Sequence, residues 1–297
     1  MYDIKSITEP NTIKEVFADL HNTPGSKIIC GGTDVLVKIR EGKLAGCSLV
    51  SIQGISELKG VCLESDGTII IRPATTFSQL TQNPIIRKHI PALGEAVDQA
   101  GGPQLRNVGT IGGNICNGAT SADSASTLLT LNAQLEITST EGVRYTPLEK
   151  FYQGPGKVHL EYGELLTAIC IPKKDYEGYS GHYIKYAMRN AMDIATLGCA
   201  VHLKLTTDKK HIHSLRLAYG VASPTPMRCY KAESLAEGEV LNADLLERIA
   251  QSALTEVSPR TSWRATKEFR EQLVKELSKR AIKISAEIAG GVKDENY

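Results

Sequence analysis

Cysteine clusters, aromatic residues and long apolar runs are all scarce in this sequence. Aromatic residues make up only 5% of the chain. No two of its seven cysteines are spaced as C-x-x-C; they are Cys30, Cys47, Cys62, Cys116, Cys170, Cys199 and Cys229. Zinc and iron–sulfur sites need tighter clusters of ligands. We therefore expect reduced thiols that act as small hydrophobic side chains, and no metal in this chain.

Features of membrane, secreted and nucleic-acid-binding proteins are also missing. No apolar stretch approaches the ~18 residues of a membrane span, and the first residues carry no apolar segment of a signal peptide. The formal net charge is +1, with Lys and Arg scattered along the chain. This distribution excludes the basic stripe of a nucleic-acid binder. We expect a cytoplasmic protein of about two domains from its 297 residues.

The first 57 residues have the pattern of an α/β unit. Asn11 is placed to cap a helix whose apolar residues recur at helical spacing, namely Ile13, Val16, Phe17 and Leu20. A short strand from Lys27 to Cys30 runs into Gly31 and Gly32, and Val35 begins a possible second helix. A further strand is expected at 49–52.

Residues 58–175 are predicted to form a second subdomain, and residues 180–290 a separate α+β domain. Asp66-Gly67 and Glu141-Gly142 are each flanked by short apolar runs, which indicates two hairpins. Helices are expected at 90–99 and at 121–131, the latter capped by Ser121, and a strand at 165–171. Beyond a polar turn near 175 come strands at 183–188, 196–205 and 215–221, helices at 245–257 and 265–284, and a tail at 291–297.

Two glycine-rich segments are candidates for a ligand site. In the first, Gly31-Gly32-Thr33-Asp34 follows a buried strand, and its glycines permit positive φ and close approach of a ligand. The exposed amides of such a turn suit an anion such as a diphosphate. For an isolated Gly-Gly pair, a plain tight turn is the more frequent interpretation.

The second segment has five glycines within thirteen residues, from Gly101 to Gly113, interleaved with amide and hydroxyl side chains. These residues have little bulk to fill a core, so the segment is suited to contact a large polar ligand through its backbone. An irregular loop with satisfied polar groups remains the alternative. The chain contains no P-loop, no G-x-G-x-x-G after a strand, no G-x-S-x-G and no H-E-x-x-H, which disfavours NTPases, Rossmann dehydrogenases, α/β-hydrolases and zincins.

These segments and others resemble a known family. The sequence is similar to the FAD-binding subunits of the molybdenum hydroxylases, in particular to the medium subunits of the bacterial xanthine dehydrogenase type. The resemblance runs through nearly the whole chain, and its motifs are Cys30 to Val37, Gln104 to Ile115, Ser121 to Ala125, Gly163 to Leu166, Lys185 to Arg189 and Ser262 to Arg270. The ordered pair of G-G-T-D and T-I-G-G-N is specific.

The resemblance implies a fold and a set of FAD-binding residues. The expected fold class is α+β: a vanillyl-alcohol-oxidase-type FAD-binding domain of two α/β subdomains, then a C-terminal α+β domain like that of CO dehydrogenase flavoproteins. The segment implied to hold the FAD diphosphate is Lys27, Ile28, Ile29, Cys30, Gly31, Gly32, Thr33, Asp34 and Val35. Further implied contacts are Thr110, Gly113, Asn114, Asp123, Leu166 on the adenine side and Lys185 close to the flavin. Ala100 stands where animal relatives carry an aromatic residue near the flavin.

The resemblance also implies partners and an activity. A large subunit would carry the molybdenum cofactor and a small subunit the [2Fe–2S] clusters, in a heterotrimer or a dimer of heterotrimers. Electrons from a purine would pass through the clusters to FAD, and hydride would pass to NAD⁺. Two alternatives remain open: an FAD subunit that serves nicotinate, CO or an aldehyde, and a flavin-free assembly module. The cysteine-bearing loop of 4-hydroxybenzoyl-CoA reductases has no counterpart here.

Overall fold

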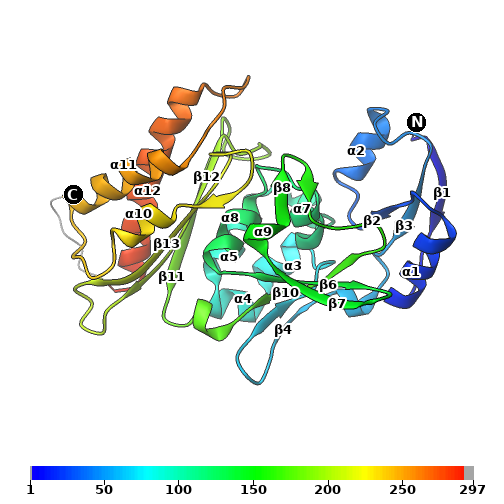
Figure 1. Ribbon diagram of the computed structural model, residues 1–297, viewed down its shortest axis with the longest axis horizontal. Coiled ribbons are helices and arrows are strands. Elements are labelled where there is room, and N and C mark those ends of the chain that lie inside the picture. The colour runs from blue at the N-terminus through cyan, green and yellow to red at the C-terminus, as the bar shows by residue number, and fades with distance from the viewer. Residues whose placement is uncertain (1, 291–297) are drawn as a thin grey trace.

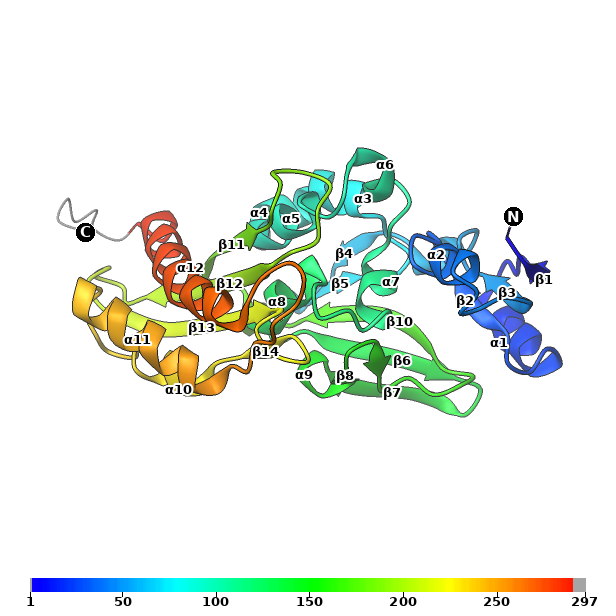
Figure 2. The same ribbon diagram turned by 90° about the horizontal axis from the view of Figure 1, so that it is seen from above.

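The molecule is elongated, with three parts arranged along its long axis (Figures 1 and 2). The structure is a computed structural model that describes residues 2–290, so the predicted tail at 291–297 lies outside the described residues. Each part has its own sheet: a parallel one near the N-terminus, and antiparallel ones in the middle and C-terminal parts. Within residues 2–290, no helix is long and apolar enough to cross a membrane.

The N-terminal part is a three-stranded parallel sheet of order β1-β3-β2 with two helices, as the α/β pattern predicts. Its elements are β1 (Ile4–Thr8), α1 (Ile13–Asn22), β2 (Lys27–Ile29), α2 (Val35–Arg40) and β3 (Cys47–Ser51). The expected cap at Asn11 is wrong by one residue, because the hydroxyl of Thr12 accepts the amide of Glu15 at 3.2 Å. Asn11 instead donates its own amide to the Glu15 carboxylate.

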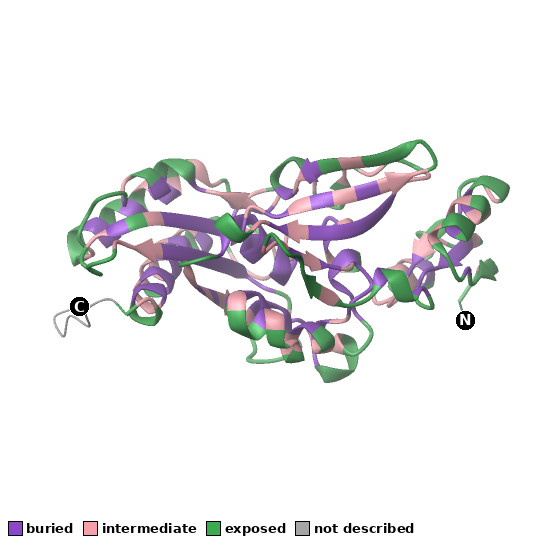
Figure 3. Ribbon diagram, turned by 90° about the horizontal axis from the view of Figure 1, so that it is seen from below, coloured by how far each residue is buried: buried purple, intermediate pink, exposed green. Residues whose placement is uncertain are grey.

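The middle part is a five-stranded antiparallel sheet of order β4-β5-β10-β6-β7. Both predicted hairpins are confirmed, and the central strand is almost wholly buried while the outer strand is largely exposed (Figure 3). The strands are β4 (Val61–Leu63), β5 (Ile69–Ile71), β6 (Gln134–Ser139), β7 (Gly142–Pro147) and β10 (Leu165–Ile171), with a small pair β8 (Tyr152–Gly154) and β9 (Lys157–Val158) beside them.

Short helices connect these strands. They are the 3₁₀ turn η1 (Ser56–Leu58), α3 (Phe77–Gln82), α4 (Pro84–His89), α5 (Pro91–Asp98), α6 (Pro103–Arg106), α7 (Ile111–Cys116), α8 (Asp123–Thr130), α9 (Leu148–Phe151) and the 3₁₀ turn η2 (Lys173–Asp175). Helix α8 begins at Asp123 after the cap residue Ala122, so the expected cap at Ser121 is wrong. Every residue of α8 is buried, because the helix also packs against the C-terminal sheet.

The C-terminal part is a four-stranded antiparallel sheet of order β11-β12-β13-β14 with three helices. Its elements are β11 (Ser180–Tyr186), β12 (Leu197–Leu205), β13 (Ile212–Gly220), β14 (Met227–Arg228), α10 (Tyr230–Ser234), α11 (Ala243–Glu256) and α12 (Lys267–Ile288). Helix α12 packs on β11 and β12, and α8 and α5 of the middle part pack on the same sheet. The first seven positions of β12 are buried because both faces of this sheet are covered.

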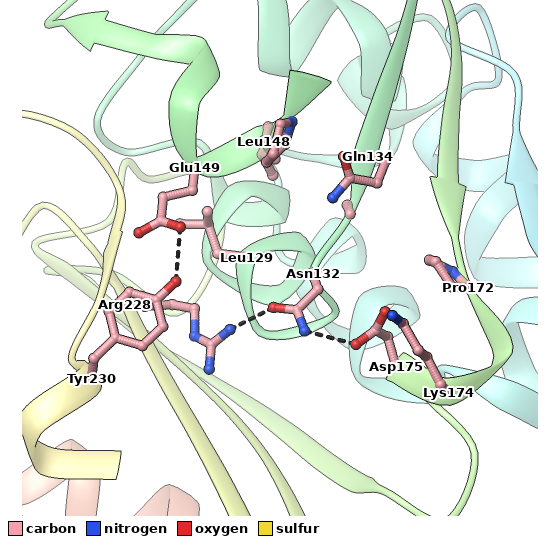
Figure 4. Close-up of a pocket in the computed structure, with 12 residues that line it drawn as sticks. Leu129, Asn132, Gln134, Leu148, Glu149, Pro172, Lys174, Asp175, Arg228 and Tyr230 are labelled. Atoms are coloured by element: carbon pink, nitrogen blue, oxygen red, sulfur yellow. Dashed lines mark hydrogen bonds between the residues drawn. The ribbon is translucent and has the colours of Figure 1, made fainter. Parts of the chain in front are cut away.

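Polar side chains pair with one another where the middle and C-terminal parts meet. They line a cavity of about 460 Å³. Figure 4 shows Asn132 between Arg228 and Asp175, with hydrogen bonds to both, and Tyr230 bonded to Glu149. Arg228 also binds Glu233 on α10. These polar and charged groups are thus paired with one another. Their bonds connect the middle part to the C-terminal part, so we interpret the network as structural.

A buried histidine in the same junction makes stability depend on pH. His202 on β12 is 3% exposed, and its Nδ1 lies 2.8 Å from the Thr130 hydroxyl of α8. Burial, with the nearby Arg216 and Arg228 guanidinium groups, lowers the pKa of His202 from 6.5 to about 3. Between these two pH values the unfolded chain binds a proton that the folded chain does not. The folded state is therefore destabilised as pH falls below ~6.5.

We expect the His202 imidazole to lower the free energy of unfolding by about 1.4 kcal/mol for each pH unit below ~6.5. Urea unfolding at several pH values between 8 and 5 gives the free energy of unfolding as a function of pH. The slope of this free energy against pH is compared between the wild type and His202→Gln. The variant should show a shallower slope. His213→Gln, on an exposed position of β13, is the matched control and should keep the wild-type slope. Equal slopes for His202→Gln and the wild type would contradict the assignment.

Candidate functional site

The first glycine turn connects β2 to α2. Gly32 has φ +72°, in the left-handed region, as expected. Gly31 does not adopt a left-handed conformation. A Cβ on Gly31 would lie 1.9 Å from the carbonyl oxygen of Val108. Gly31 is therefore needed because another part of the backbone passes directly against it.

The second glycine segment ends in a helix, since Ile111, Gly112 and Gly113 form the start of α7. Thr110 caps α7, and its hydroxyl accepts the amide of Gly113 at 3.2 Å. A Cβ on Gly112 would lie 2.4 Å from the Cβ of Pro73, so this glycine lets the helix pack tightly against the residues after β5. The amide of Ile111 donates to Thr75, and that of Gly112 to Pro73. The amides at this helix start are thus used within the fold.

The two segments meet in space, because Gly31 lies against Val108 and Gly109, directly before Thr110. Residues of both segments line a cavity of about 830 Å³ between the N-terminal and middle parts. This volume falls within the ~300–1,000 Å³ of small-molecule and cofactor sites. Its wall includes apolar side chains such as Phe77, Leu165 and Leu166.

Twelve of the fifteen residues predicted for the site line this cavity. They are Ile28, Cys30, Gly31, Gly32, Thr33, Asp34, Val35, Thr110, Gly113, Asn114, Asp123 and Leu166. Lys27 and Ile29 do not line it, since side chains alternate along β2 and only Ile28 and Cys30 face this way. Ile29 instead packs in a small core with Ile39 and Leu49.

Lys185, the third of the predicted residues outside the wall, lies behind Asp123. Its Nζ donates to Asp123 Oδ2 at 3.0 Å and to the carbonyl of Gln99 at 2.9 Å. The hydroxyl of Tyr183 donates to Asp123 Oδ1 at 2.8 Å. Burial raises the pKa of Asp123, and Lys185 and Tyr183 oppose that rise. Both partners come from β11, so the C-terminal part orients an acidic side chain in the cavity wall.

The amides of the first turn are free to bind a ligand. Within residues 2–290, those of Gly32, Thr33 and Asp34 have no hydrogen-bond acceptor. Successive unpaired amides at a turn form a concave site for an anion. Burial raises the pKa of the neighbouring Cys30 thiol, which keeps it protonated. The turn therefore offers hydrogen-bond donors rather than a reactive thiolate.

Several wall residues were not predicted from the sequence. Lys38 on α2 and Asn117 after α7 face each other, with Lys38 Nζ 2.7 Å from Asn117 Oδ1. Helical spacing places Lys38 one turn after Asp34, a signal that was available in the sequence. The β11–β12 loop contributes Met192, Asp193 and Ile194, and no sequence signal linked this loop to the glycine segments. No group of His, Cys, Asp and Glu within residues 2–290 is arranged to hold a metal ion.

Comparisons with known proteins agree over nearly the whole chain. The family model for the FAD binding domain in molybdopterin dehydrogenase matches residues 3–174, and that for the CO dehydrogenase flavoprotein C-terminal domain matches 182–284. The putative xanthine dehydrogenase FAD-binding subunit of Escherichia coli K12 is 46% identical over 291 residues, 98% of this chain and 99% of that protein. The nicotinate dehydrogenase FAD-subunit of Eubacterium barkeri is 31% identical over 244 residues, 80% of this chain and 81% of its own length.

A solved structure is similar throughout. A chain of the carbon monoxide dehydrogenase from Hydrogenophaga pseudoflava superposes with a TM-score of 0.91 and 25% identity, covering 97% of this chain and 99% of its own. The chain belongs to the FAD-binding subunits of the molybdenum hydroxylase family. The expected fold class, an FAD-binding domain followed by a CO-dehydrogenase-flavoprotein-type C-terminal domain, is thereby confirmed.

Proposed function

We propose that this chain is the FAD-carrying electron-transfer subunit of a xanthine dehydrogenase. The observation that carries the proposal is the meeting of the two glycine segments at one cavity, whose first turn offers three unpaired amides. The relative that is 46% identical over nearly its full length supports the choice of xanthine, since it is described as a xanthine dehydrogenase subunit.

The residues present fit FAD. The unpaired amides of the turn within Lys27 to Val35 suit the diphosphate, and the apolar wall at Leu166 suits a planar ring. Thr110, Gly113 and Asn114, from the second segment, line the same cavity. Lys27 and Ile29 belong to the site only as parts of the strand that positions the turn. We place the domain boundary near residue 175, with subdomains at about 1–57 and 58–175 and the C-terminal domain at 180–290.

When bound, FAD supplies the conversion between one-electron and two-electron transfer. The protein contributes orientation and charge. Asp123 and Lys185 form an ion pair at the cavity wall, so the lysine charge that a flavin experiences is partly cancelled by the carboxylate. Among the described residues that line the cavity, none form a general acid and base pair, which suits hydride transfer. We propose NAD⁺ as the hydride acceptor.

Partners complete the proposed enzyme. A large subunit with the molybdenum cofactor would oxidise the purine, and a small subunit with [2Fe–2S] clusters would carry electrons to this chain in a cytoplasmic heterotrimer. The second candidate is the FAD subunit of an enzyme that acts on nicotinate, CO or an aldehyde. It is favoured by the 31% identity to a nicotinate dehydrogenase FAD-subunit.

The test is purification of the tagged chain with its bound partners, followed by assays with several substrates. We expect flavin absorbance, and NAD⁺ reduction that depends on xanthine or hypoxanthine. Turnover of nicotinate, CO or an aldehyde without turnover of xanthine would support the second candidate. A colourless protein, with no flavin after reconstitution, would contradict both and favour an assembly module. Xanthine-dependent dye reduction without NAD⁺ reduction would contradict the proposed acceptor.

A further inference from the structure

Charges in the cavity wall are distributed unevenly. Among the described residues that line the cavity, Lys38 is the single lysine or arginine, whereas three carboxylates line it: Asp34, Asp123 and Asp193. A dinucleotide brings a doubly negative diphosphate into such a cavity. The location of the positive charge therefore limits where the diphosphate binds favourably.

Two of these carboxylates, Asp123 and Asp193, already have cationic partners outside the wall. Asp123 pairs with Lys185 at 3.0 Å. Asp193 lies 3.5 Å from Arg189 and also accepts the backbone amides of Arg189 and Ile194. These partners hold the carboxylates, and none of the cations reaches the cavity surface as part of its lining.

Lys38 lies on α2, the helix that directly follows the unpaired amides of the first turn. Its own amide donates to the carbonyl of Asp34, which places Lys38 one helical turn beyond the glycine turn. Asp34 makes no side-chain cap hydrogen bond at the start of α2. Without Lys38, an anion bound at the turn would meet the negative charge of Asp34 with no nearby cation in the wall.

The present partner of Lys38 is neutral. Its Nζ donates to Asn117 Oδ1 at 2.7 Å, a bond that joins α2 of the N-terminal part to the end of α7. A hydrogen bond from a lysine to a phosphate oxygen is charge-assisted on both sides and stronger than one to an amide oxygen. Exchange of the amide for a phosphate is therefore favourable, and the flexible stem of lysine permits it.

We propose that Lys38 is the diphosphate-neutralising residue of the FAD site, and that it exchanges Asn117 for a phosphate oxygen when the cofactor binds. This inference rests on the proposed function, because it requires FAD in this cavity. It adds a side chain to a subsite otherwise formed by the amides of Gly32, Thr33 and Asp34. The competing role for Lys38 is purely structural: a link between α2 and α7.

The test compares FAD with riboflavin, which lacks phosphate, on the full-length chain freed of flavin. Binding is followed by the change in flavin fluorescence at low and moderate salt. Lys38→Met should raise the dissociation constant for FAD about tenfold, equivalent to about 1.4 kcal/mol, and leave that for riboflavin unchanged. The salt dependence of FAD binding should weaken as well. Lys38→Arg should restore most of the affinity for FAD.

Two further variants make the test specific. Lys43→Met removes an exposed lysine just beyond α2, which pairs with Glu41 outside the cavity, and should leave both constants unchanged. Asn117→Ala removes the link between α2 and α7 but keeps the charge. If it lowers the preference for FAD over riboflavin as much as Lys38→Met does, the pair acts as a structural link and our inference is wrong.

An unchanged preference for FAD in Lys38→Met would also overturn the inference while leaving the FAD-carrying function intact. If the wild-type chain binds neither flavin, the proposed function itself fails. The two failures are therefore distinguishable in one set of titrations.

Discussion

Gly31→Ala is expected to abolish flavin retention and to destabilise the fold. The new Cβ would lie 1.9 Å from the oxygen and 2.6 Å from the carbon of the Val108 carbonyl. Both are backbone atoms, so relief requires that the two glycine segments move apart. Overpacking of this kind costs about 1–3 kcal/mol, and more where backbone must shift. Separation of the segments also removes the geometry on which the cavity depends.

The measurements are the flavin-to-protein absorbance ratio after gel filtration and the free energy of unfolding in urea. Gly54→Ala is the matched control, because Gly54 has no left-handed φ and nothing lies within 4 Å of its added Cβ. This control should keep both values. A Gly31→Ala protein with full flavin content and wild-type stability would show that the close approach of the two segments is not required.

Lys185→Met is expected to have the next largest effect. The side chains of Lys185 and Asp123 are 6% and 10% exposed, so the substitution leaves a buried carboxylate without its cation. Breaking a buried pair from one side costs about 3–5 kcal/mol. With the flavin bound in this cavity as we propose, we also expect a lower flavin reduction potential, because a positive charge behind Asp123 is lost. An unchanged potential would show that Lys185 has no electrostatic effect on the flavin.

The loss of stability in Lys185→Met should depend on pH. The pKa of Asp123 is raised by burial and held down by Lys185, so removal of the lysine raises it further. A carboxylic acid whose folded pKa exceeds its unfolded pKa keeps its proton longer in the folded state. Stability of the variant therefore falls as pH rises through that folded pKa, and the deficit shrinks in acid.

Urea unfolding across pH for Lys185→Met and for Lys185→Met with Asp123→Asn tests this assignment. The double variant carries no buried charge at this position. It should recover much of the lost stability at high pH and lose the part of the pH dependence that comes from Asp123. If the double variant is as unstable as the single one at every pH, the deficit comes from lost packing of the lysine stem rather than from the carboxylate.

Regular elements with a strong periodicity were predictable from the sequence. The hairpin at Asp66-Gly67 and the long helices α11 and α12 lie where the patterns indicated. Helix α7 was missed because two of its six residues are glycines, which are poor helix formers. It forms because Thr110 caps it and because Pro73 and Thr75 accept its first amides. β1 was missed because four of its five residues are exposed, leaving no apolar alternation.

The site was predictable as two glycine segments but not as a complete wall. Gly31-Gly32 and Thr110 could be identified from the sequence, because paired glycines and a threonine before a glycine-rich segment stand out within a few residues. The contact between Lys185 and Asp123 joins residues that are 62 positions apart. Lys38 and Asn117 are 79 apart. Such pairs depend on how α8, β11 and α7 pack, which periodicity does not encode.

The two bonds from β11 to Asp123 limit how this protein can be recombined in evolution or by design. A C-terminal domain transplanted from a relative would have to bring a hydroxyl and an ammonium group to the same positions as Tyr183 and Lys185. Otherwise the host would carry a buried Asp123 without its two hydrogen-bond partners. Functional hybrids should therefore take α8 and β11 from the same parent, although these two elements belong to different domains.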